Sequence, residues 1–359
     1  MTKRLLLLNG LAVLAVPLHH ATGYGFRAMF EWTDRYLPVA APNYDQIGSL
    51  AYYVIILIQQ LDNFALPAFL FVSGFFIAFA AGGSQSLKWN AVMARLKYLM
   101  IPFVFWTMAF FIILLQRLPL NLVEALDRYY YIPLLAQFYL VSPFIVPLAR
   151  NHWKLLLSVT GFLELGWAVI RCFNTLETGG AVVDWLMFLT PRWLIPTLFF
   201  WFTLGVVAGF HRQPLAQWLD RVKWRLLAAM VILGVLTIVE YQFLAYLAGK
   251  EWLGPYFGGV SRKLYSLAFI LCFLAFDKLS LPFSKQISQL GGKSLGIYLA
   301  HSLAMYVAAV MMYRQTPWVL GNQLLYQGAL IVIALVIPLL LMSVLSKSAA
   351  RGVYRYVFG

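Results

Sequence analysis

The chain has 359 residues, of which 62% are hydrophobic and only 11% are charged, and its mean hydropathy is +0.78. Soluble domains are about half apolar and about a quarter charged, so this composition excludes an ordinary globular protein, and the continuous apolar runs exclude a disordered one. The remaining class is an all-α polytopic membrane protein. In such a chain the formal net charge of +14 reflects membrane topology first, and nucleic-acid binding has no independent support.

A membrane-spanning helix needs about 20 mostly apolar residues. The sequence predicts about ten spans in a single membrane domain over residues 1–359, without a linker between parts. The predicted spans are 5–22, 61–82, 97–116, 129–149, 154–172, 192–211, 225–248, 258–276, 294–313 and 325–346. The apolar run 50–81 is too long for one perpendicular helix, so residues 46–60 are predicted to form a separate interfacial or re-entrant segment.

The distribution of basic residues predicts the orientation of the chain. With ten spans and a cytoplasmic N-terminus, 17 of the 27 Lys and Arg residues lie on the cytoplasmic side, as the positive-inside rule expects. Both termini are therefore predicted to be cytoplasmic, with an external loop at 23–49 and a cytoplasmic tail at 347–359. The alternative of a cleaved signal peptide is disfavoured, because His19 and His20 occupy the place of the cleavage site.

Ionisable side chains inside apolar spans cost several kcal/mol on insertion scales, and they are functional candidates for that reason. They are His19, His20, Asp62, Glu164, Glu240 and His301. A rise of about 1.5 Å per residue puts His20 and Glu240 at similar depth, with Asp62 near the outer end of its span. These three are expected to meet in an outer cavity, where a carboxylate could orient the histidine as a general base. The structural alternative is that these side chains are solvated near the helix ends or hydrogen-bonded to neighbouring groups. For Glu164, a structural hydrogen bond is as plausible as a role in the site.

Several short motifs follow one another in an order that is itself informative. They are Asn9–His20, Phe71–Ile77 with its Ser-Gly-Phe, Ala94–Pro102, Phe202–Gly205, and Gly291–His301 with its S-x-x-x-Y-L-x-H pattern. In this order they resemble the acyltransferase-3 family of integral membrane acyltransferases, whose usual number of spans is ten. One position departs from that pattern: the family carries an Arg separated by ten residues from the first-span His, and here the residue is Asn9.

The resemblance implies transfer of an acyl group, acetyl or succinyl, from acyl-CoA as co-substrate to a hydroxyl of an envelope glycan or similar acceptor. It also implies a bacterial inner (plasma) membrane location. His20 is then the candidate base, with Asp62 or Glu240 as its orienting partner. The candidates for contacting the substrate or the developing oxyanion are Tyr24, Ser73, Tyr298 and His301.

The donor carries phosphates and is cytoplasmic, so its site should be basic and open inward. The candidates are Arg95, Lys97, Arg150 and Ser294, the last at the start of a predicted helix. Alternatively, the basic residues only set the orientation of the chain in the membrane, and Ser294 is an ordinary helix N-cap. The two cysteines, Cys172 and Cys272, have no metal-site spacing, so no metal and no resident cofactor are expected. Nothing in the sequence indicates an oligomeric state.

A different functional class remains open at this point. A proton-coupled transporter or flippase could use the intramembrane acids Asp62, Glu164 and Glu240 as proton or substrate sites. The absence of recognisable inverted repeats argues mildly against it.

Overall fold

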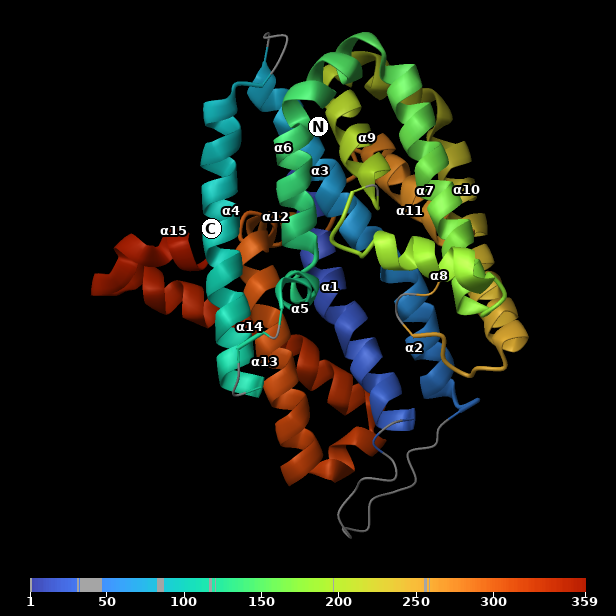
Figure 1. Cartoon of the computed structure of the whole chain (residues 1–359), viewed down its shortest axis with the longest axis vertical. Helices are drawn as coiled ribbons and strands as arrows, with labels where there is room; N and C mark the ends of the chain where they lie inside the picture. Colours follow the sequence, from blue (N-terminus) through green and yellow to red (C-terminus); the bar gives the residue numbers. More distant parts are fainter. Residues whose placement is uncertain are drawn as a thin grey trace.

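The computed structural model of the protein describes residues 2–30, 32, 47–82, 87–115, 118–119, 121–195, 197–254, 257 and 259–359. The regular secondary structure of these residues is entirely helical, and α1 (Thr2–Phe30) runs through the middle of the bundle (Figure 1). The other α-helices are α2 (Leu50–Leu61), α3 (Ala65–Ala81), α4 (Trp89–Phe110), α5 (Leu122–Arg128), α6 (Tyr131–Asn151), α7 (Trp153–Thr175), α8 (Gly180–Leu189), α9 (Phe199–Phe210), α10 (Arg212–Ala248), α11 (Val260–Ala275), α12 (Ser284–Gly291), α13 (Ser294–Gln315), α14 (Gln323–Lys347) and α15 (Tyr354–Val357). Shorter turns are the 3₁₀ segments η2 (Asp62–Phe64), η4 (Pro317–Gly321) and η5 (Ala349–Val353), and the π-helical segment η3 (Phe111–Leu115).

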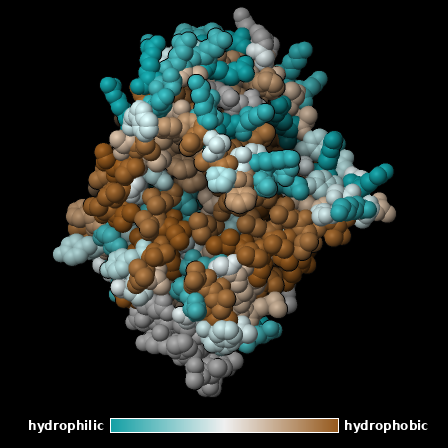
Figure 2. Space-filling view, turned by 180° about the vertical axis from the view of Figure 1, so that it is seen from behind, coloured by the Kyte–Doolittle hydropathy of each residue, from teal (hydrophilic) through white to brown (hydrophobic). Residues whose placement is uncertain are grey.

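Eight of the described helical segments are long and apolar enough to cross a membrane: α1, α2 with α3, α4, α6, α7, α10, α13 and α14. Hydrophobic residues cover the middle of the face in Figure 2, and hydrophilic residues gather at its top. This confirms the predicted fold class, a polytopic helical membrane protein. Two of the ten predicted spans are shorter than expected, since 192–211 contains the 12-residue α9 and 258–276 contains the 16-residue α11.

Three predicted boundaries change in the structure. Helix α1 continues to Phe30, so the first eight residues of the expected loop 23–49 are helical, and most of the remainder of that loop lies outside the described residues. The expected segment 46–60 is largely α2, which Ser49 caps and which η2 separates from α3. The expected tail 347–359 folds as η5 and α15 against α4, where the indole nitrogen of Trp106 donates to the carbonyl of Val357 at 2.8 Å.

Helix α10 shows how the bundle meets the lipid. Its 37 residues extend roughly 55 Å, which exceeds the hydrocarbon core of about 30 Å. The first part, from Arg212 to Arg225, is rich in charged residues, and the later part presents exposed apolar side chains. These are Val231, Ile232, Val235, Leu236, Val239 and Phe243. Because charged residues avoid the hydrocarbon and exposed apolar residues favour it, the first part lies outside the hydrocarbon core and the second part lies against the lipid.

The most extensive helix contact among the described residues joins α3 to α9. A Cβ atom at Gly74 would overlap the carbonyl of Phe202, and one at Gly205 would overlap the carbonyl of Phe71. Two backbones can approach this closely only where neither helix carries a side chain, which is how small residues join helices in membranes. Two of the sequence motifs, Ser-Gly-Phe and Phe-Thr-Leu-Gly, therefore form one packing contact.

We expect Gly205→Ala to destabilise the protein by about 1 to 3 kcal/mol, because the new methyl group must push two packed backbones apart. The measurement is the thermal unfolding midpoint in detergent. Gly166→Ala in α7 is the matched control, since no atom outside its own helix backbone lies within 4 Å of its added Cβ. Equal midpoints for the two variants would contradict the packing role.

Candidate active site

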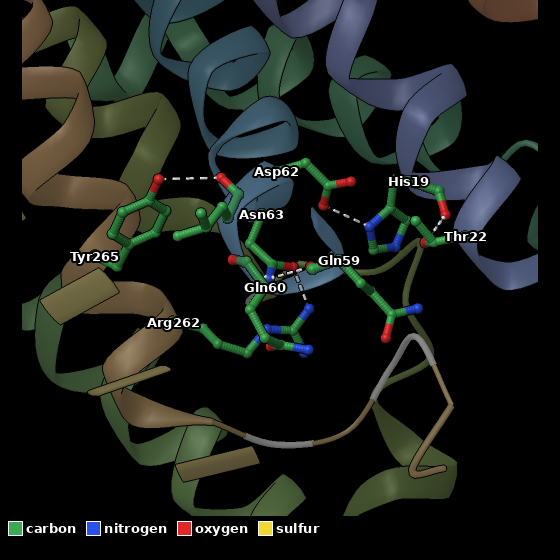
Figure 3. A network of polar contacts seen from close by, with 9 residues as sticks. His19, Thr22, Gln59, Gln60, Asp62, Asn63, Arg262 and Tyr265 are labelled. Atoms are coloured by element: carbon green, nitrogen blue, oxygen red, sulfur yellow. Dashed lines mark hydrogen bonds and ion pairs between the residues drawn. The ribbon is translucent and has the colours of Figure 1, made fainter. Parts of the chain in front are cut away.

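The carboxylate of Asp62 pairs with His19 at the point where α2 ends. The Nδ1 atom of His19 lies 2.7 Å from Oδ1 of Asp62, and the Asp62 side chain is only 4% exposed (Figure 3). Asp62 is the first residue of η2, the turn that interrupts the long apolar segment between Leu50 and Ala81. A 3₁₀ turn inside a long helix is a feature of functional sites, and here it carries the carboxylate.

A polar network surrounds this pair (Figure 3). The amide of Asn63 donates to the carbonyls of Gln59 and Gln60 at 2.8 Å each, and its oxygen accepts from the guanidinium of Arg262. These bonds satisfy backbone groups that the break in the helix would otherwise leave without partners, as a low-dielectric environment requires. The side-chain amides of Gln59 and Gln60 are fully buried and find no partner within the described residues, which is the usual environment of ordered water.

His20 lies where two cavities meet. The small cavity, about 180 Å³, lies between α1, η2, α7 and α11, and both His19 and His20 line it. The large cavity, about 630 Å³, lies between α1, α5 and α13 and contains His20, His301 and Tyr298 in its wall. Such a volume is typical of small-molecule sites. His20 and Tyr298 belong to both cavities, so a molecule in either one can reach them.

His301 faces His20 from α13. The two ring centroids are 5.3 Å apart, and Nδ1 of His301 lies 2.6 Å from the carbonyl oxygen of Tyr298. Because a carbonyl only accepts, Nδ1 carries a proton, and in the neutral form of the ring the lone pair is therefore on Nε2. That Nε2 atom is buried and has no hydrogen-bond partner in the described part of the chain.

Basic residues are concentrated around the two cavities. Of the ten Lys and Arg residues that the predicted topology places outside, six line a cavity: Arg27, Arg128, Arg171, Arg192, Arg262 and Lys263. From the sequence alone, these six residues are assigned no role beyond their contribution to the count of basic residues outside the membrane. The signal that could have identified them is that they lie on the side that the positive-inside rule leaves poor in basic residues.

Tyr129 also lines the large cavity beside Arg128. Burial raises the pKa of its phenol to about 12, against the opposing effect of the Arg128 charge. The phenol is therefore a neutral hydrogen-bond donor at any physiological pH.

The other two intramembrane acids lie away from His20. Glu164 accepts from the indole nitrogen of Trp201 at 3.0 Å and pairs with Lys263 at 2.6 Å. Glu240 accepts from the backbone nitrogens of Val260 and Ser261, at 2.9 and 3.0 Å, and so caps α11. The expected meeting of three residues in one cavity is found for His20 and Asp62 and not for Glu240, and the carboxylate of Asp62 contacts His19 rather than His20.

We expect Glu164→Gln to lower stability by about 1 to 3 kcal/mol, since it leaves the charge of Lys263 without its partner. Gln keeps an oxygen for Trp201, so the variant isolates the loss of charge. The double variant Glu164→Gln/Lys263→Met should recover much of the midpoint, because it removes both charges together. An unchanged thermal midpoint in Glu164→Gln would show that the pair is not structural.

The predicted substrate residues are only partly brought together. Tyr24 lines the large cavity, Tyr298 lines both cavities, and His301 lines the large one. Ser73 lies in α3 within hydrogen-bonding reach of Tyr131 and Tyr139, and it lines neither cavity.

The predicted donor residues lie outside both cavities. Arg95 and Lys97 are on α4, and the guanidinium of Arg150 on α6 donates to the carbonyl of Gly82 at 2.8 Å. Ser294 is the first residue of α13 and not its N-cap, which is Lys293. Ser294 lines a hollow of about 10 Å³, which Tyr298 and His301 also line and which is about the size of one water molecule.

Asn9, the position that departs from the motif, has a clear structural partner. Its amide donates to the carbonyl of Gly291 at 2.7 Å and to the Ser294 hydroxyl at 3.2 Å. Arg4, one and a half turns earlier, donates to the carbonyls of Phe273 and Leu279 at 3.0 Å each. Asn9 therefore ties α1 to the start of α13, and Arg4 ties it to the end of α11.

No group of three or more His, Cys, Asp or Glu side chains suited to a metal ion occurs in the described ranges.

A family model described as an acyltransferase domain matches residues 4–343, nearly the whole chain. Comparison with curated proteins and with solved structures found no match. The matched range contains α1 with its histidines, η2, the α3–α9 contact and α13. The chain therefore belongs to the acyltransferase-3 family and is an integral membrane acyltransferase.

Proposed function

We propose that the protein is an O-acyltransferase that moves an acetyl or succinyl group from acyl-CoA to a hydroxyl of an envelope glycan or similar acceptor. The observation that carries the proposal is the position of His20, a histidine in the wall of both cavities. No hydrogen bond holds its ring to another described residue. An imidazole placed in this way can take up a proton from an acceptor in one cavity while the reacting carbonyl approaches.

The chemistry needs one base and one set of hydrogen-bond donors. A ring nitrogen of His20 accepts the proton of the acceptor hydroxyl as its oxygen attacks the thioester carbonyl, which gives a tetrahedral oxyanion. Tyr24 and Tyr298, both in the cavity wall, are the donors to that oxyanion. When the intermediate collapses, the carbon–sulfur bond breaks and the imidazolium returns its proton to the departing thiolate of CoA.

His19 is a second candidate for the base. It is the one histidine of the cavity wall that pairs with a carboxylate among the described residues, and this contact fixes the orientation of its ring. Neighbouring residues of a helix project about 100° apart, so His19 and His20 cannot both contact the same hydroxyl in the same way. The two bases predict different outcomes for the variants below.

We expect His20→Gln to lower kcat for transfer by about 100-fold or more, because the reaction loses its general base. The measurement is release of free CoA thiol from acetyl-CoA or succinyl-CoA by the purified protein in nanodiscs with an acceptor glycan. His152→Gln, at an exposed residue between α6 and α7, is the matched control and should keep full activity.

The variants His19→Gln and Asp62→Asn distinguish the two bases. If His20 is the base, both variants retain measurable transfer, with a loss smaller than that of His20→Gln. If instead His19→Gln is inactive and His20→Gln remains active, the base is His19 and the assignment to His20 is wrong. A fully active His20→Gln variant together with a fully active His19→Gln variant would remove the base from both.

The donor is proposed to bind from the cytoplasm. Arg95, Lys97 and Arg150 provide positive charge for its phosphates on α4 and α6. Ser294, at the start of α13, is the fourth residue proposed for the donor site, and it lines the small hollow that His301 also lines. The envelope acceptor and the bacterial inner membrane are proposed from the family membership of the chain.

Both termini are proposed to lie in the cytoplasm, which is supported by the 17 basic residues that this orientation places there. We expect a green fluorescent protein fused after Gly359 to be fluorescent and an alkaline phosphatase fused at the same point to be inactive. The opposite pair of results would invert the orientation and place the large cavity on the cytoplasmic side.

A further inference from the structure

We propose that the acceptor bound in the large cavity carries an oxyanion, a phosphate or a carboxylate, and that Arg128 binds this group. That the bound molecule is the acyl acceptor rests on the proposed function. That it carries an anionic group rests on the contacts of Arg128. It narrows the substrate from any hydroxyl compound to an acidic one.

The groups in direct contact with the guanidinium of Arg128 are neutral. Its guanidinium lies 3.5 Å above the ring centroid of Phe110, and its Nη2 atom donates to the hydroxyl of Ser302 at 2.7 Å. Its Nε atom is buried and has no hydrogen-bond partner within the described residues. No carboxylate in that part of the chain forms an ion pair with it.

The nearest acid in the sequence is already engaged. Asp127, which also lines the cavity, pairs with Arg192 at 2.6 Å. The wall of the large cavity therefore contains three guanidinium groups, those of Arg27, Arg128 and Arg192, against the two carboxylates of Asp127 and Glu124. The wall therefore carries one positive charge more than its acids can balance.

An unbalanced guanidinium inside a membrane protein is costly unless an anion or water compensates it. The planar guanidinium matches the geometry of a phosphate or carboxylate and can bind either with two parallel hydrogen bonds. Phe110 fixes the plane of the group from one side, which reduces the entropy lost on binding. An oxyanion is the ligand that this arrangement recognises, because a neutral sugar would not balance the positive charge of Arg128.

The position of Arg128 also connects the anion to the chemistry. Ser302, its hydrogen-bond partner, is the residue after His301 in α13, and the His301 ring is 5.3 Å from that of His20. An acceptor held by its anionic group at Arg128 thus lies in the same cavity as the proposed base. The anion then sets which hydroxyl of the acceptor faces His20.

Binding of matched ligands to the purified protein in nanodiscs tests the inference. The ligands are glucose 1-phosphate, glucuronic acid and neutral glucose, measured by calorimetry for the wild type and for Arg128→Gln. We expect at least one acidic ligand to bind roughly tenfold or more tightly than glucose, and Arg128→Gln to abolish this difference. Arg128→Lys should keep part of it, since the charge stays and the paired geometry is lost. The ligand that is preferred identifies the anion as phosphate or carboxylate.

Arg212→Gln is the matched control, because Arg212 lies at the start of α10 outside both cavities and should keep the preference. Thermal midpoints show whether Arg128→Gln is folded, and Arg128→Lys gives the result if it is not. Equal binding of acidic and neutral ligands in the wild type, including no binding of any, overturns the inference. A preference that survives in Arg128→Gln overturns it as well.

Failure of the proposed function would look different. If acidic ligands bind and lose their preference in Arg128→Gln, yet no CoA thiol is released with any acceptor, the anion site stands and acyl transfer from CoA does not. If the wild type and Arg128→Gln both release CoA thiol equally with acidic and neutral acceptors, acyl transfer is supported and the anion site is not.

Discussion

The cost of placing a charge in a bilayer organises the interior of this protein. Each of the three intramembrane carboxylates has a different kind of partner: Asp62 has a histidine, Glu164 has a lysine and an indole, and Glu240 has the N-terminus of a helix. Each partner donates hydrogen bonds to the carboxylate, which is what the low dielectric constant of the membrane requires. Two of these carboxylates, Glu164 and Glu240, thereby hold helices together.

This pairing explains why positive charge remains around the cavities. Glu164 and Asp127 are bound to Lys263 and Arg192, and no carboxylate of the described residues forms an ion pair with Arg128. A polytopic membrane protein can keep such a charge only where water or a ligand reaches it. The cavities are therefore both the places where chemistry can occur and the places where the remaining basic residues can be solvated.

Hydropathy alone predicted most of the fold, because long apolar segments in a membrane protein have few alternatives to the helix. It overestimated α9, whose residues Trp201 and Phe202 are apolar because they pack inside the bundle and not because they face lipid. Depth along a helix placed His20 correctly in a cavity, but depth says nothing about direction around the helix axis. For that reason the sequence could not show that Asp62 faces His19, or that Glu240 faces the start of α11.

The contact between α3 and α9 has a mechanical consequence. At Gly74 and Gly205 the two backbones meet directly, so at these two points no side chain can change rotamer to let the helices slide. We expect this contact to hold α3 firmly against α9, and the Leu50–Ala81 segment is interrupted only at the short turn Asp62–Phe64. The carboxylate that pairs with His19 belongs to this turn, so a change in the angle between α2 and α3 would act directly on the His19–Asp62 contact beside the cavities.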